Sequence, residues 1–308
     1  MRLVCALAIA AFISGSAAAS PPERSSVAAP PIYFNHVTIY VEPTVFTAIA
    51  SAPVLSELAG FNESTTQRDG GTWSYTGLYI RGQHTYLEFM KASNDPIRSI
   101  GRAPAGDLSF CMWVDDRLKL PLVRDRLAAR THTDPKISMS KLFIGGRDIA
   151  WFDKVGATDS GDTSIAARTY VMSLYPDYLR QRYPDLKAEE DGTTRDKRER
   201  QYVPDRLLHD ITRFTLAVSA REEDLLLSEF EAYGYTLGVD GNGQRTASGP
   251  EIEFRFIRST GDSPRKLAID LDLNRPKSGE QLHRVGSGSE LEFSGKKATW
   301  YFPAGWRP

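Results

Sequence analysis

The chain has little cysteine and almost no net charge, and each shortage argues against a class of protein. Its 308 residues include two cysteines, 38 basic side chains and 39 acidic ones, for a formal net charge of −1. That balance provides no electrostatic attraction to nucleic acid or to an anionic membrane, so neither is predicted as a partner. Hydrophobic residues make up 41% of the chain and charged residues 25%, which is typical of a soluble globular protein of one large or two modest domains.

The one long apolar run lies at the N-terminus, over Leu3–Ile13. It follows a basic residue and is followed by small residues up to Ala19, which is the layout of a secretory signal peptide. The run is too short to span a bilayer as a stable anchor, so no membrane insertion is expected. We therefore predict a signal peptide over residues 1–19, a disordered lead-in over residues 20–31, and an exported protein, either periplasmic or secreted.

Only Cys111 remains after that cleavage. A single cysteine cannot form an internal disulfide, so the domain must be stabilised by its hydrophobic core. The sequence also lacks the G-x-S-x-G nucleophile motif, the P-loop, and a G-x-G-x-x-G between a strand and a helix. Those families of hydrolases and nucleotide-binding proteins are therefore not indicated.

Three segments repeat the same pattern. They begin at Asn35 ("NHVTIYVEPTVFTAIASAPVLSELAGF"), at Leu108 ("LSFCMWVDDRLKLPLVRDRLAAR") and at Thr212 ("TRFTLAVSAREEDLLLSEFEAYGY"). Each opens with an apolar strand, passes an acidic turn and enters an amphipathic helix, and further strands follow. The pattern predicts an α+β fold of repeated βαβββ-type modules, whose curved mixed sheets surround a cleft and carry helices on the outer face.

The modules divide the mature chain into three parts. Paired βαβββ modules are expected over residues 32–178, and a third βαβ-type module with a C-terminal hairpin over residues 211–304. Between them, residues 179–210 include the dense charge run "DLKAEEDGTTRDKRERQ", which predicts a charged helical linker.

Alternation along each strand indicates which side chains face the cleft. In the first strand Val37 and Ile39 belong under the helix, so His36 and Tyr40 face the open side. The same argument places Glu88 on the open face of its strand. The ligand-binding residues predicted in this way are Tyr40, Tyr86, Trp113 and Arg213, which would line a pocket for a small molecule.

Two stretches resemble the vicinal oxygen chelate superfamily, the glyoxalase/bleomycin-resistance fold. "NHVTIYV" looks like the opening strand of its module, and "YLEFM" looks like the closing strand. "SYTGLYIRGQHTYLEFM" and "TYVMSLYPDYLRQRYP" are similar to a group of bacterial glyoxalase-like proteins of unknown function. The resemblance implies metal ligands on the first and last strand of each module, hence one divalent ion held by His36 and Glu88, which would also be the catalytic residues.

The later modules depart from that pattern. Ser109 stands where the resemblance expects a second histidine, and the closing position of the second module falls near Ser173. The third module offers Arg213 and Asp270. Serine is a poor ligand for a divalent ion, and an arginine repels one, so the sequence predicts an eroded metal site.

Two functions therefore remain open. The first is an exported glyoxalase-like protein that binds a small ligand in its cleft, without a complete metal site. The alternative is a divergent metal-dependent lyase, isomerase or dioxygenase that uses His36 and Glu88. In an intermediate case, Glu88 acts as a general base that His36 orients.

Overall fold

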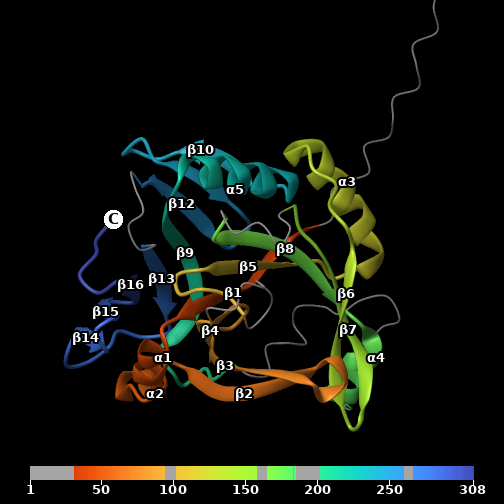
Figure 1. Ribbon diagram of the computed structural model, residues 1–308. Helices are drawn as coiled ribbons and strands as arrows, with labels where there is room; N and C mark the ends of the chain where they lie inside the picture. The colour runs from red at the N-terminus through yellow and green to blue at the C-terminus, as the bar shows by residue number, and fades with distance from the viewer. Residues whose placement is uncertain (1–30, 94–101, 158–164, 183, 185–201, 260–265) are drawn as a thin grey trace, which may run out of the picture.

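The first of two eight-stranded sheets is formed by the paired modules predicted from the sequence (Figure 1). Its strand order is β2-β3-β4-β1-β5-β8-β7-β6. In each module the opening strand runs parallel to the closing strand, and the two opening strands pair antiparallel at the centre of the sheet. The strands are β1 (Tyr33–Val41), β2 (Gly60–Arg68), β3 (Trp73–Arg81), β4 (Tyr86–Lys91), β5 (Leu108–Trp113), β6 (Ser138–Ile144), β7 (Arg147–Val155) and β8 (Ala167–Leu174).

Short helices connect these strands. In both modules of this sheet a proline begins the helix or stands in its first turn, where its missing N–H costs nothing. The helices are α1 (Pro43–Ala50), α2 (Pro53–Leu58), α3 (Leu120–Thr131) and α4 (Pro176–Arg182), with 3₁₀ turns η1 (Asp69–Gly71) and η2 (Arg117–Lys119). None of the helices in the described parts of the chain is long and apolar enough to cross a membrane.

The second sheet contains two modules where the sequence predicted one and a hairpin. Its order is β10-β11-β12-β9-β13-β16-β15-β14. The elements are β9 (Leu208–Val218), α5 (Ala220–Ala232), β10 (Thr236–Val239), β11 (Arg245–Ser248), β12 (Glu253–Arg258), β13 (Leu267–Leu273), β14 (Leu282–Val285), β15 (Ser289–Ser294) and β16 (Lys297–Phe302). The expected C-terminal hairpin is β15 and β16, and β13 and β14 complete a fourth module with it.

This fourth module has no helix, and the loss of the helix changes its topology. In the first three modules a helical crossover returns the chain so that opening and closing strands run parallel. A parallel connection needs a crossover of a dozen or more residues. Only residues 274–281 separate β13 from β14, so the chain turns back directly and β13 pairs antiparallel with β16.

The two sheets share one hydrophobic core. Their helix-facing sides meet, with Phe34 and Phe110 of the first sheet against Phe214 and Phe254 of the second. The ring centroids of Phe34 and Phe214 are 5.3 Å apart, and those of Phe110 and Phe254 are 5.2 Å apart. α3 and α5 lie side by side next to this layer (Figure 1). The expected α+β fold, with helices on the faces away from the cleft, is therefore confirmed.

The first sheet curls until its two edge strands, β2 and β6, come close together. The turn η1 after β2 also contacts the neighbouring strand β7, where the Gly70 N–H donates to Asp148 Oδ1 at 3.1 Å. Gly71 has φ +80°, and a Cβ on it would lie 2.9 Å from the Phe143 ring. A glycine is therefore needed where the edges meet, and the curled sheet encloses a space on its open face.

The structure describes the chain in six stretches, and some predictions fall outside them. The signal peptide and nearly all of the lead-in lie outside the described residues, as does most of the charged linker beyond α4. The described residues are 31–93, 102–157, 165–182, 184, 202–259 and 266–308.

Candidate functional site

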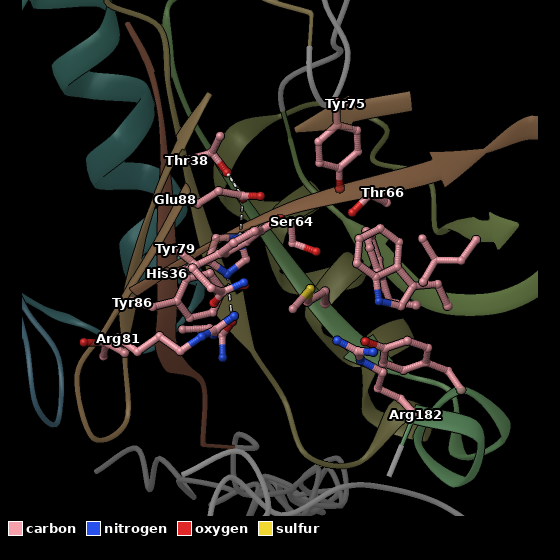
Figure 2. A pocket seen from close by; sticks show the side chains of 18 of the residues that line it. His36, Thr38, Ser64, Thr66, Tyr75, Tyr79, Arg81, Tyr86, Glu88 and Arg182 are labelled. Atoms are coloured by element: carbon pink, nitrogen blue, oxygen red, sulfur yellow. Dashed lines mark hydrogen bonds and ion pairs between the residues drawn. The ribbon is translucent and has the colours of Figure 1, made fainter. Parts of the chain in front are cut away.

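A cavity of about 410 Å³ lies inside the curled first sheet. Strands β1 to β4 form one wall, and β6, β7, β8 and α4 contribute to the other. Figure 2 shows Glu88 and Thr38 on one side of this cavity and Arg182 on the opposite side. The cavity lies on the open face of the sheet that alternation along β1 and β4 predicted.

His36 and Glu88 meet at the wall formed by β1 and β4. These neighbouring strands run parallel, and the register places Thr38 directly beside Glu88. The Thr38 hydroxyl donates to Glu88 Oε2 at 2.8 Å, and His36 Nε2 lies 3.7 Å from the same oxygen (Figure 2). His36 and Glu88 are 4% and 5% exposed, so both face the cavity from a buried position.

The His36 ring is held on two sides. Asn35 Oδ1 accepts a hydrogen bond from Nδ1 at 2.7 Å, and the Tyr86 ring stacks on the imidazole with centroids 4.4 Å apart. A neutral ring that donates from Nδ1 to Asn35 directs the lone pair of Nε2 toward Glu88. Asn35, the residue that precedes His36 in the sequence, therefore favours the tautomer with the proton on Nδ1.

Burial raises the pKa of Glu88 above its usual value. Hydrogen bonds from the Thr38 and Tyr79 hydroxyls and the positive charge of Arg81 act in the opposite direction and offset part of this effect. Gly77 leaves the space for this arrangement, since a Cβ there would lie 2.8 Å from the Tyr79 hydroxyl oxygen and 3.0 Å from Glu88 Oε1. A buried carboxyl of this kind can donate a hydrogen bond when protonated and accept a proton when ionised.

The donor set does not fit a divalent metal ion. His36 and Glu88 provide two donors, and the described residues contain no group of three or more His, Cys, Asp and Glu side chains placed to hold a metal. We therefore derive no chemical step through a metal.

The closing position of the second module differs from the predicted one. Ser109 corresponds to His36, so Cys111 corresponds to Thr38, and the residue in register with Cys111 is Tyr170. Tyr170 lines the cavity. The closing position is therefore Tyr170 and not Ser173, which lies three positions further along β8, so that its side chain points to the opposite face.

Two of the four predicted ligand-binding residues are packed away from the cavity. Tyr40, 3% exposed, packs against Tyr75 and Met90. Trp113, 1% exposed, packs in a second cluster, and its Nε1 donates to Asp115 Oδ1 at 2.7 Å. Both side chains lie on the predicted face of the sheet, but neither is among the described residues that line the cavity. Tyr86 does line it.

Arg213 belongs to the other sheet. Its Nε donates to Asp270 Oδ2 at 2.6 Å, and its Nη1 lies 3.5 Å from Glu253 Oε1. The sequence interpretation placed Asp270 on a closing strand, and this placement is wrong. It lies on β13, the opening strand of the fourth module, directly opposite Arg213. The second sheet therefore carries ion pairs at the positions that correspond to His36 and Cys111.

Several residues of the cavity lie outside the site predicted from the sequence. Tyr75, Tyr79 and Arg81 alternate along β3 and line the cavity, so that strand carried the same signal that identified His36. Others come from elements that only the curl of the sheet brings opposite β1 and β4, and no local pattern marks them: Phe143, Trp151, Tyr170, Tyr178 and Arg182.

Fold and site together define an α+β protein in which paired βαβββ modules curl around a polar, tyrosine-rich cavity. The chain belongs to the family described as a family of unknown function (DUF5829), whose model matches residues 34–302. A search of proteins with curated functions gives no significant match.

Solved structures give distant matches. One is a hypothetical protein from Staphylococcus aureus, with a TM-score of 0.47 and 9% identity. The match covers 74% of this chain and 86% of that protein. Another is a mutant of 4-hydroxymandelate synthase from Streptomyces coelicolor, with a TM-score of 0.40 and 14% identity. The match covers 77% of this chain and 64% of the synthase. A xylose isomerase-like TIM barrel/4-hydroxyphenylpyruvate dioxygenase fusion protein has TM-score 0.39 and 11% identity, over 74% of this chain and 33% of its own.

Proposed function

We propose that this protein binds a small organic molecule in the cavity of the first sheet, with Glu88 as the central polar contact. The observation that carries the proposal is a buried carboxyl group facing a cavity of about 410 Å³. A cavity of this size in which polar groups converge is typical of small-molecule sites. Burial raises the pKa of Glu88, which favours a carboxylic acid able to donate a hydrogen bond to an oxygen of the ligand.

The rest of the cavity fits that role. Hydroxyl and imidazole groups of Thr38, Tyr79 and His36 surround Glu88, while Trp151 and Tyr178 provide aromatic surface on the opposite wall. Aromatic side chains offer a large contact area at low conformational cost. A ligand that combines an oxygen substituent with a flat apolar part would therefore satisfy both walls.

The experiment is a fragment screen by ligand-observed NMR with two matched variants. Ser64 lines the cavity, whereas the preceding residue, Glu63, is exposed and is not among the lining residues. We expect Ser64→Trp to fill the cavity and abolish binding of the fragments that the wild-type protein binds, and Glu63→Trp to retain it. Unchanged binding of every fragment to Ser64→Trp would show that the ligand site lies elsewhere.

A metal-dependent lyase, isomerase or dioxygenase is the second candidate, and one observation favours it. The hydrogen bond from His36 Nδ1 to Asn35 directs Nε2 toward Glu88, as outer partners orient histidine ligands in metal sites. Elemental analysis by mass spectrometry, with His36→Ala as the control, separates the two candidates. Stoichiometric metal that disappears in His36→Ala would support the enzyme, and a metal-free protein after dialysis against Zn, Fe, Mn and Ni would count against it.

A further inference from the structure

The cavity is surrounded by positive charge. Arg81 reaches it from β3 and Arg182 from α4 (Figure 2). Among the described residues that line it, Glu88 is the one acidic side chain, and its carboxyl is buried. The described lining therefore combines two arginine side chains with one buried carboxyl group.

The two arginines are positioned differently. Arg81 is fixed by aromatic rings, since its guanidinium carbon lies 5.1 Å from the Tyr79 centroid and 4.9 Å from that of Tyr86. Arg182 has no ion pair with any carboxylate in the described parts of the chain, whereas its neighbour Arg180 is paired with Asp177. Aromatic rings thus fix the position of Arg81, and the guanidinium group of Arg182 is available to pair with a ligand.

Two more cations point into the same curled sheet. Arg68 shares the inward face of β2 with Ser64 and Thr66, and its Nε is buried without a hydrogen-bond partner. Lys154 Nζ lies 5.7 Å from the ring of Tyr170, a lining residue. Neither cation is paired with a carboxylate among the described residues. Burial, and to a smaller extent the nearby Arg68, lowers the pKa of Lys154.

We propose that the ligand of this cavity is a small organic anion whose negative group is received between Arg81 and Arg182. The inference rests on the proposed binding function and adds the chemical class of the ligand. A guanidinium group matches a carboxylate or a phosphate with two parallel hydrogen bonds. The attraction is stronger in a cavity than in bulk water, because less solvent screens the charges.

Anion binding is then linked to the protonation of Glu88. The charge of Arg81 favours the ionised form of Glu88, and an anion beside Arg81 opposes that effect. At a pH where part of the Glu88 population is ionised, binding of the anion is therefore accompanied by proton uptake at Glu88. Calorimetry in buffers of different ionisation enthalpy measures this uptake, and Glu88→Gln removes the titrating group without filling the cavity.

The test compares each acid with its own amide at constant ionic strength. The probes are benzoate and benzamide, and succinate and succinamide, with phenyl phosphate to separate carboxylate from phosphate ligands. We expect the full chain to bind acids and not amides, with proton uptake that Glu88→Gln abolishes. Loss of one charge-assisted contact in Arg81→Gln or Arg182→Gln should weaken binding by about tenfold or more. Arg124→Gln, an exposed arginine of α3, should bind like wild type.

The outcomes separate this inference from the binding function itself. If amides bind as tightly as acids, and Ser64→Trp abolishes their binding, the proposal of an anionic ligand is overturned and the proposal of a small-molecule site stands. Acid binding that is unchanged in both arginine variants would also overturn it. Failure of every acid, amide and phosphate to bind would count against both proposals.

Discussion

At the residue scale, Glu88 shows how one buried group depends on its neighbours. The parallel register of β1 and β4 places Thr38 beside it, and Gly77 leaves room for Tyr79 to reach it. These hydroxyls and Arg81 stabilise the ionised form, while burial opposes it more strongly, so the pKa is raised. Burial therefore favours the protonated carboxyl, while its hydrogen-bond donors and Arg81 favour the ionised one.

Glu88→Gln should change how the stability of the protein depends on pH. A raised pKa in the folded state means that folding favours the protonated form, so the contribution of Glu88 is complete below its unfolded pKa and is lost as pH rises through the folded one. Glutamine does not ionise. We expect the variant to gain stability relative to wild type as pH rises across that interval, by about 1.4 kcal/mol for each unit of pKa shift.

Urea denaturation at a series of pH values measures this difference. The matched control is Glu63→Gln, because the Glu63 side chain is exposed on the neighbouring strand. A constant stability difference between Glu88→Gln and wild type at every pH would show that the Glu88 pKa is the same in the folded and unfolded protein.

At the element scale, the turn between β3 and β4 is held by a residue of the other sheet. Asp210, on β9, accepts hydrogen bonds from the backbone N–H groups of His84 and Thr85 at 3.0 and 3.1 Å, and from the Thr85 hydroxyl. The close approach requires Gly82, where a Cβ would lie 2.7 Å from Asp210 Oδ1. His84 and Thr85 also line the cavity of the first sheet. A residue of the second sheet, Asp210, therefore holds part of the cavity wall in place.

Asp210→Ala should destabilise the protein more than an average aspartate substitution. It leaves two backbone donors without their acceptor, and each lost bond to a charged group is worth about 1.5–3 kcal/mol. The free energy of unfolding in urea measures the loss. Asp272→Ala is the control, because Asp272 lies at the end of β13 and pairs with exposed Lys297. Equal losses in the two variants would contradict a bracing role for Asp210.

At the scale of the whole molecule, the two sheets are joined through one core but carry different open faces. The first sheet curls around a cavity, and the second carries ion pairs such as Arg213 with Asp270. Phe34 and Phe110 lie against Phe214 and Phe254 between the sheets. Separation of the sheets would expose all four rings, so neither sheet is expected to unfold alone.

Phe214→Ala should therefore lower the stability of both sheets equally. Removal of a fully buried phenylalanine costs about 3–5 kcal/mol, and Phe214 is 0% exposed. Native-state hydrogen exchange of the slowest amides in β1 and β13 reports each sheet separately. We expect the same decrease in both, and little change in exposed Phe61→Ala. A decrease confined to β13 would show that the sheets unfold independently.

The sequence by itself determined three of the four modules and the face of the strands that open them. Apolar residues alternate along β1 and β13, and that period follows from strand geometry alone. His36, Tyr86 and Glu88 were therefore predicted to share the open face, and the structure brings them together. Export and the role of the N-terminal residues stay predictions, because they concern residues 1–30, outside the described chain.

Only the tertiary structure decided which open-facing residues share one cavity. Alternation shows the face of a strand, but it does not show which sheet the strand joins or how far that sheet curls. Arg213 has the predicted orientation on the wrong sheet, and Tyr40 and Trp113 have it at positions where other side chains cover them. The contact of β2 with β6 creates the enclosed space and brings Arg182 opposite Arg81. That contact joins residues far apart in the chain, so its free energy depends on packing that no local pattern records.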